Sequence, residues 1–226
     1  MDCDPANPAD SDLHFFLQRF GARPPKGEVP FILFFLGGIT TWSFINNNWM
    51  QSGHMIVKHI DLLDQVKLEA ETIVVVKLIA SLIEFVLNFL VFIVFSATLG
   101  YFPNATYLYL PIIIFFIILT TLGGMYFFSS LGVFVRDIPN VIGMALRLLF
   151  FVSGVLITPD MIPDKFQGIL SINPLLHLIE SLRSIIIYSQ PPSLISFIYM
   201  GSFSLLAFLI GLTHFQKRKG IFVDYK

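Results

Sequence analysis

Residues 107–135 read YLYLPIIIFFIILTTLGGMYFFSSLGVFV, a run without a single charged side chain. An α-helix needs about 20 mostly apolar residues to cross the hydrocarbon core of a bilayer, which is roughly 30 Å thick. The run exceeds this length, and Gly123, Gly124 and Gly132 would let neighbouring helices approach its backbone closely. The stretch therefore predicts a membrane-spanning helix.

The composition of the whole chain agrees with this prediction. Of its 226 residues, 55% are hydrophobic and only 13% are charged, and 25 are phenylalanine. A soluble fold could not cover so much apolar surface with so few charges. The net charge of −1 and the absence of a long Lys/Arg block argue against a nucleic-acid partner. We expect an all-α membrane protein, a polytopic bundle whose surroundings are membrane lipid.

The same length rule identifies spans elsewhere in the chain. The five predicted spans cover about residues 29–45, 73–99, 107–135, 141–158 and 194–215. Residues 1–28 then form a short polar N-terminal segment, and residues 29–226 form one transmembrane domain. Between the last two spans, Pro159, Pro163, Pro174 and Pro191 interrupt residues 159–191. The apolar runs between these prolines are too short to cross, so this segment predicts short re-entrant or interfacial helices.

Lysine and arginine in short loops predict the orientation of the spans, because such loops stay on the cytoplasmic side. The tail QKRKGIFVDYK (216–226) is basic, and alternation of the spans places Lys58, Lys67 and Arg136 on the same side. We expect a multi-pass protein of the cytoplasmic (inner) membrane with a cytoplasmic C-terminus.

Residues 49–67 follow the first span with an amphipathic pattern. The apolar positions Trp49, Ile56, Ile60 and Leu63 recur at helical spacing, and Lys58 falls elsewhere on the helical wheel. This pattern predicts a helix that lies at the cytoplasmic interface. It is typical both of a plain surface helix and of a docking site for a soluble partner.

Polar side chains follow one face of the second predicted span, at Lys77, Ser81, Glu84 and Asn88. Ionisable groups are costly in lipid and should face the bundle interior or water. Arg147 of the fourth span lies at a depth at which it could contact Glu84. The stripe therefore belongs either to a translocation path or to polar contacts that hold helices together.

His177, Glu180 and Arg183 follow one another at three-residue steps, almost on one helical face. A metal site would need a third ligand, and none lies at a suitable spacing. A local charge pair is therefore the better interpretation. The sequence also contains no GxxxxGK[ST] phosphate loop, HExxH, GxSxG or Rossmann glycine motif. We expect no catalytic residue, cofactor or metal in this chain, and an energy source in another one.

Several short motifs are distributed along the chain from about residue 24 to the C-terminus. The most specific ones lie in the C-terminal half: Arg136-Asp137, FVSG (151–154), Ile162-Pro163, and NPLLH (173–177) followed by Glu180 and Arg183. Two further stretches lie in the N-terminal half, PFILFFLGGITTW (30–42) and DLLDQVK (61–67). In these motifs the chain resembles the permease subunits of ABC-2-type polysaccharide exporters, which export capsular polysaccharide or O-antigen.

The resemblance implies a permease homodimer coupled to two cytoplasmic ABC ATPase subunits, which bind ATP and Mg and drive export of a nascent or lipid-linked glycan. It implies that residues 49–67 are the coupling region, with Trp49, Ile56, Lys58, Ile60, Leu63 and Lys67 as candidate contacts. It also implies that residues 159–191 form the gate, with Pro163, Asn173, Pro174, His177, Glu180 and Arg183 as candidate gate residues.

Members of this family begin with a cytoplasmic amphipathic helix and an additional first span. Residues 13–27 (LHFFLQRFGARPPKG) look like the end of that span and its outer loop. We therefore expect the chain to lack the amphipathic helix and the first span of its family.

Aromatic side chains are expected along a glycan path because sugar rings stack on aromatic faces. Trp42, Tyr126 and Phe127 are the candidates, although core packing or lipid contact is the better interpretation for any single one of them. Alternative functions are an ABC-2 permease for teichoic acid, a lipid or a drug, a membrane-embedded enzyme acting on glycolipids, and an inert membrane scaffold. An enzyme of that kind needs paired intramembrane carboxylates, and only Glu84 is deep.

Overall fold

The structure is a computed structural model that describes residues 29–60, 69–135, 137–156, 168, 171–220 and 222. Its helices form a bundle, as the sequence predicts, and the described residues contain no strand. The helices are α2 (Phe31–Lys58), α4 (Ala70–Thr98), the 3-10 helix η1 (Ala105–Tyr109), α5 (Leu110–Phe134), α6 (Ile138–Val152), α8 (Pro174–Ile186) and α9 (Leu194–Arg218).

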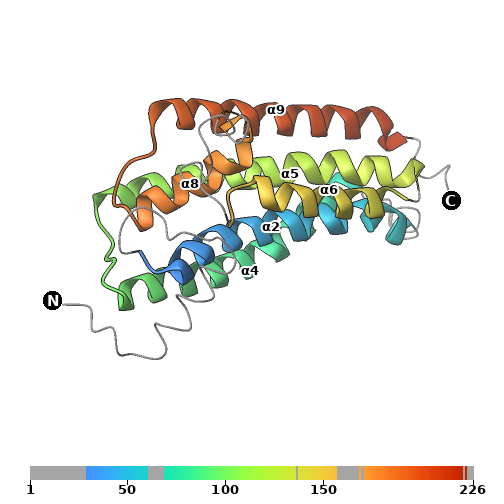
Figure 1. Cartoon of the computed structure of the whole chain (residues 1–226). Coiled ribbons are helices and arrows are strands. Elements are labelled where there is room, and N and C mark those ends of the chain that lie inside the picture. Colours follow the sequence, from blue (N-terminus) through green and yellow to red (C-terminus); the bar gives the residue numbers. More distant parts are fainter. Residues whose placement is uncertain are drawn as a thin grey trace.

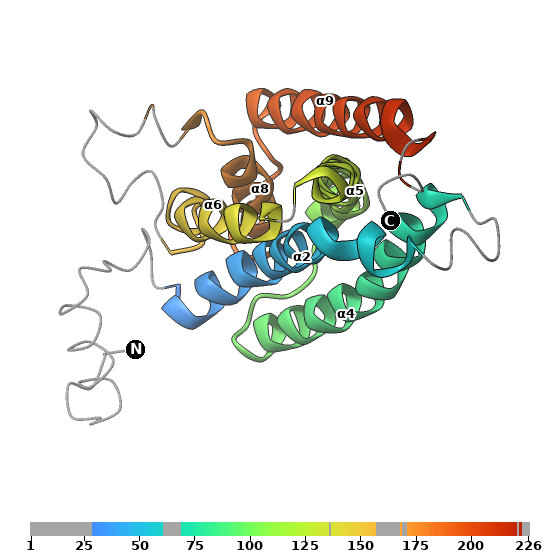
Figure 2. The ribbon, with the colours of Figure 1, turned by 90° about the vertical axis from the view of Figure 1, so that its right-hand side faces the viewer.

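Helix α2 lies in the middle of the bundle. It contacts α4, α5, α6 and α8, while α9 packs along the far side of α5 (Figures 1 and 2). The core is continuous across these contacts and includes Leu33, Phe92, Ile117, Ile179 and Phe215, all nearly inaccessible to solvent. In contrast, most of the apolar surface of α4 and α9 faces outward, as expected of helices in contact with lipid.

Within the part of the chain that the structure describes, three helices are long and apolar enough to cross a membrane: Ala70–Thr98, Ala105–Phe134 and Leu194–Arg218. They correspond to the second, third and fifth predicted spans. Helix α6 has only 15 residues, so the predicted fourth span, 141–158, ends early at Val152. The chain turns there through Ser153 and Gly154, whose φ of 81° is accessible mainly to glycine.

The first predicted span and the segment after it form one helix rather than two. The prediction of a separate interfacial helix starting at Trp49 is wrong, because α2 continues without a break from Phe31 to Lys58. The polar residues in its middle do not end the helix, since the Asn48 amide donates to the carbonyl oxygen of Phe44 and packs against α4. The amphipathic pattern instead reflects packing, with Ile56 fully buried.

Glycines set the closest helix contacts, as the sequence predicts. A Cβ added at Gly123 would collide with the backbone of Ala207 in α9. One added at Gly132 would collide with the backbone of Gly53 in α2. Since neither site tolerates a methyl group, these glycines let α5 lie directly against both neighbours.

One end of the bundle, which we call the basic end, gathers the end of α2, the start of α4, and the ends of α5 and α9 (Figure 1). There the ammonium of Lys219 lies 2.6 Å from a carboxylate oxygen of Glu71. The guanidinium of Arg218 lies over the ring of Phe134. The predicted alternation of the spans, which places Lys58 and the basic tail on one side, matches this arrangement of helix ends.

Candidate functional site

A line of polar side chains separates α2 from α4, and we call it the polar seam. Thr40, Ser43, Asn47 and Asn48 contribute from α2, and Ser81, Glu84 and Asn88 contribute from α4. The seam opens to the surface of the chain, where Asn47, Glu84 and Asn88 are exposed. Three of the four members of the predicted polar stripe therefore meet a second polar stripe on α2.

Hydrogen bonds hold the buried side of the seam together. The Ser81 hydroxyl lies 2.9 Å from the amide oxygen of Asn48, which is 1% exposed. Thr40 donates to the carbonyl oxygen of Leu36. The sequence interpretation missed the α2 half of this site. The run Asn46-Asn47-Asn48 at the end of a predicted span was the signal that could have revealed it.

Glu84 and Arg147 do not meet, so the predicted contact between them is wrong. Both are exposed, and their helices, α4 and α6, lie on different sides of α2 (Figure 2). Lys77, the remaining member of the stripe, lies nearer the basic end. It lines a groove with residues of α2 and α6 rather than the polar seam.

Helix α8, part of the predicted gate segment, is anchored at its start by Asn173. The Asn173 side chain accepts a hydrogen bond from the backbone N–H of Leu175 and donates to the carbonyl oxygen of Val152. Pro174 occupies the first helical turn, where its missing N–H costs nothing. The gate candidate Pro163 lies outside the described residues.

Arg183 is the most extensively bonded side chain of α8, and it is completely buried. Its guanidinium donates to the carbonyl oxygens of Phe34 (3.0 Å), Gly154 (2.7 Å) and Val155 (2.9 Å). It also forms an ion pair with Glu180 at 2.7 Å, which confirms the predicted local charge pair. The sequence interpretation missed the long-range part, in which Arg183 joins α8 to α2 and to the turn after α6.

His177 connects α8 to neighbouring segments. Its Nδ1 lies 3.1 Å from the Ser196 hydroxyl of α9, and its Nε2 lies 2.8 Å from the carbonyl oxygen of Ser171. The ring also packs edge-on against Tyr199. Among the described residues, no group of His, Cys, Asp or Glu side chains is placed to hold a metal ion.

The candidate coupling residues separate into two groups. Trp49 and Ile56 pack inside the bundle, with the indole N–H of Trp49 donating to the carbonyl oxygen of Thr121 at 3.1 Å. Lys58 is exposed at the basic end, and Ile60 is half-buried beyond it. Leu63 and Lys67 lie outside the described residues. Ile56 is thus enclosed by the bundle, whereas Trp49 is half-buried against α5, and their roles in coupling stay predictions.

Two of the three candidate channel aromatics are core residues. Trp42 and Tyr126 are each 5% exposed and pack against other rings, Trp42 on Phe150 and Tyr126 on Phe215. Core packing, the alternative to a channel role, therefore describes both side chains in this chain. Phe127 is half-buried beside His214 of α9, and its role in a channel stays a prediction.

Comparison with known proteins identifies the family of this membrane bundle. Residues 13–187 match the family described as ABC-2 type transporter. Because the match covers well over half of the chain, the chain belongs to the ABC-2 type transporter family. The resemblance stated from the sequence motifs is confirmed.

Two relatives extend the comparison. The chain is 26% identical over 215 residues to the O-antigen export system permease protein RfbA of Klebsiella pneumoniae, an alignment that covers 94% of this chain and 81% of that protein. It is 24% identical over 194 residues to the polysialic acid transport protein KpsM of Escherichia coli, covering 86% and 71%. The chain is therefore a multi-pass transport permease.

Proposed function

We propose that this chain is the permease subunit of an ATP-driven exporter that moves a polysaccharide or a lipid-linked glycan across the cytoplasmic membrane. The names of its relatives support this proposal, since both describe the movement of a glycan. A separate cytoplasmic ABC ATPase would supply the energy by binding ATP with Mg. A second copy of the permease would complete the path.

The polar seam is the observation that carries the proposal. Glu84 lies 14 residues beyond Ala70, or about 21 Å along α4, which places it within the predicted hydrocarbon region. An exposed carboxylate at that depth is unfavourable against lipid, so this face must meet water or protein. Carboxylate, amide and hydroxyl groups are also suitable hydrogen-bond partners for sugar hydroxyls. We assign the seam to the glycan path, with the second permease shielding it from lipid.

The basic end is the proposed site of ATPase contact, on the cytoplasmic side together with the C-terminus. Lys58 and Ile60 lie where α2 leaves the bundle and so remain candidate contacts. Residues of α2 that are buried farther from the basic end would transmit force to the rest of the bundle and would not contact the ATPase. The gate proposal rests on α8, whose Arg183 ties it to α2, so that movement of α2 would displace the short helix.

A second candidate is an ABC-2 permease for teichoic acid, a lipid or a drug, which the same family would accommodate. The seam favours a hydroxyl-rich substrate over an apolar drug, because its open face presents amides and a carboxylate. A glycan carries the hydrogen-bonding groups that such a seam can contact, whereas an apolar molecule does not.

Deletion and complementation test the proposal. Cells that lack the chain should accumulate a glycan inside and lose it from the surface, and the restored gene should reverse both changes. The purified permease should also retain an ABC ATPase and stimulate its ATP turnover. Normal surface glycan in the deleted strain, or an ATPase whose turnover the permease leaves unchanged, would contradict the proposal.

A further inference from the structure

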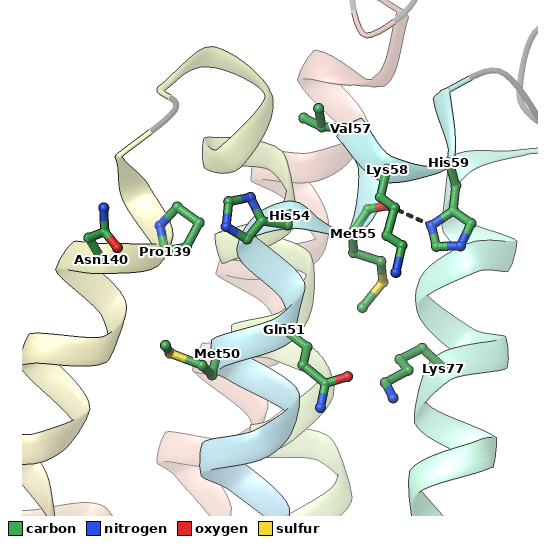
Figure 3. A pocket seen from close by; sticks show the side chains of 10 residues that line it. All are labelled: Met50, Gln51, His54, Met55, Val57, Lys58, His59, Lys77, Pro139 and Asn140. Atoms are coloured by element: carbon green, nitrogen blue, oxygen red, sulfur yellow. Dashed lines mark hydrogen bonds between the residues drawn. The ribbon is translucent and has the colours of Figure 1, made fainter.

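A groove of about 740 Å³ opens at the basic end between α2, α4 and α6. Figure 3 shows the side chains of Lys58, Lys77 and Gln51 lying between α2 and α4, and His54 on the side of α2 that faces Pro139. The volume falls within the range of about 300–1,000 Å³ that is typical of small-molecule sites. The groove is separate from the polar seam.

The groove collects positively charged side chains. Among the described residues, its lining contains the ammonium groups of Lys58 and Lys77 and the rings of His54 and His59, but no carboxylate. Neither lysine forms an ion pair with a carboxylate of the described residues. The amides of Gln51 and Asn140 add neutral donors. These groups together fit an anionic ligand rich in hydrogen-bond acceptors, and a phosphate has that chemistry.

The rest of the lining is apolar. Met50, Met55, Val57 and Pro139 border the same groove, and Met50 and Val57 are exposed beside it. Methionine side chains adapt readily to irregular apolar partners such as acyl chains. The site thus combines cations with an apolar flank, which matches the two parts of a phospholipid.

The depth of Lys77 distinguishes a lipid from a soluble partner. Lys77 lies seven residues inside the start of α4 at Ala70, or about 10 Å along the helix. It is half-buried against the groove rather than placed at the aqueous tip of the bundle. A soluble protein docked on the helix ends would not reach this depth, whereas a lipid headgroup lies at it.

We propose that this groove binds the phosphate headgroup of an anionic membrane phospholipid, with Lys58 and Lys77 as its main contacts and its acyl chains beside Met50, which lies farther from the end of α2. Binding of this kind is distinct from glycan transport and does not depend on the proposed function, but it would assign Lys58 to the lipid and leave Ile60 as the candidate ATPase contact. It would hold the junction of α2 and α4 at a fixed depth in the membrane.

Native mass spectrometry of the purified full chain tests the proposal. The detergent-solubilised protein is titrated with phosphatidylglycerol or phosphatidylcholine, and bound lipid is counted. We expect the protein to prefer phosphatidylglycerol, and Lys58→Gln or Lys77→Gln to weaken its binding by about fivefold each. Lys77→Arg should retain the preference. Lys217→Gln is the matched control, because Lys217 is exposed at the same end but does not line the groove.

Three results would overturn the proposal. An equal loss in Lys217→Gln would show that the preference reflects the overall charge of this end. Unchanged lipid binding in the double variant Lys58→Gln/Lys77→Gln would show that the groove is not the lipid site. Complete displacement of phosphatidylglycerol by equimolar glycerol phosphate would assign the groove to a soluble phosphate instead of a lipid. Retention of the lipid under that competition, with loss in the groove variants alone, is the expected result.

Discussion

The guanidinium of Arg183 lies over the ring of Phe34, with its central carbon 3.5 Å from the ring centroid, and its Nε donates to the carbonyl oxygen of the same residue at 3.0 Å. Residues 149 positions apart in the chain are thus joined at one point. The same guanidinium also binds the turn at Gly154 and Val155. A single buried side chain therefore holds three segments of the bundle together.

Replacing Arg183 by lysine should destabilise the protein markedly. A single ammonium cannot reproduce the planar set of bonds to Phe34, Gly154, Val155 and Glu180, so buried acceptors lose their donors. We expect a loss of about 3 kcal/mol, seen as a lower unfolding temperature when heated samples are analysed by size-exclusion chromatography. Arg147→Lys is the control, because Arg147 is exposed on α6 and should tolerate the change. Equal unfolding temperatures for both variants would contradict the anchor role.

The contact of α5 with α2 should fail when Gly132 gains a methyl group. A Cβ at this position would collide with the backbone of Gly53, and a backbone cannot move aside cheaply. Gly143→Ala offers a matched comparison, since its added methyl would meet only the flexible end of Met50. We expect Gly132→Ala to reduce the yield of folded protein in membranes severely, and Gly143→Ala to leave most of it. Similar yields for the two variants would show that the helices are not in such close contact.

The Lys219–Glu71 ion pair should fasten the end of α9 to the start of α4 in a pH-dependent way. The hydrogen bond to Glu71 raises the pKa of the Lys219 ammonium above its ordinary value of 10.5. A raised lysine pKa means that the contact stabilises the fold at and below neutral pH and is lost as the pH rises through the raised value.

A spin label on Gly220→Cys, with Cys3→Ser to remove the native thiol, can follow this contact. The label should be restrained at pH 8 and become mobile once the pH rises through the raised pKa of Lys219, where the lysine loses its proton. Lys219→Gln should make the label mobile throughout, and Lys217→Gln should not. Unchanged mobility in Lys219→Gln would mean that the buried rings of Phe215 and Phe222 alone hold this segment.

The periodicity and composition of the sequence predicted those features of the fold that depend on local sequence alone. The charge-free run around Gly123 became a spanning helix, and the glycines in it became contact points, because chain length and side-chain size determine both. The Glu180–Arg183 pair was also foreseeable from its three-residue spacing.

Long-range partners were not foreseeable in the same way. Asn48 sits in a polar run that reads as the end of a span, yet Ser81 of another helix satisfies it and α2 continues. The wheel that placed Trp49 on the apolar face of an interfacial helix could not reveal that the carbonyl oxygen of Thr121 accepts its N–H. Hydropathy alone does not determine whether water, lipid or another helix contacts a polar or aromatic side chain. For this reason the sequence did not predict the partners of Asn48 and Trp49.

Glycan export by variants of two adjacent residues on α4 tests the central claim, that the polar seam lines the path. Asn88 is exposed in the seam, whereas its neighbour Leu87 is 59% exposed on the apolar surface of the same helix. Surface glycan is measured in cells with equal amounts of either variant in the membrane. We predict that Asn88→Trp lowers export by about tenfold or more, equivalent to about 1.4 kcal/mol, while Leu87→Trp stays near the unmodified level. Equal export by the two variants would contradict the claim.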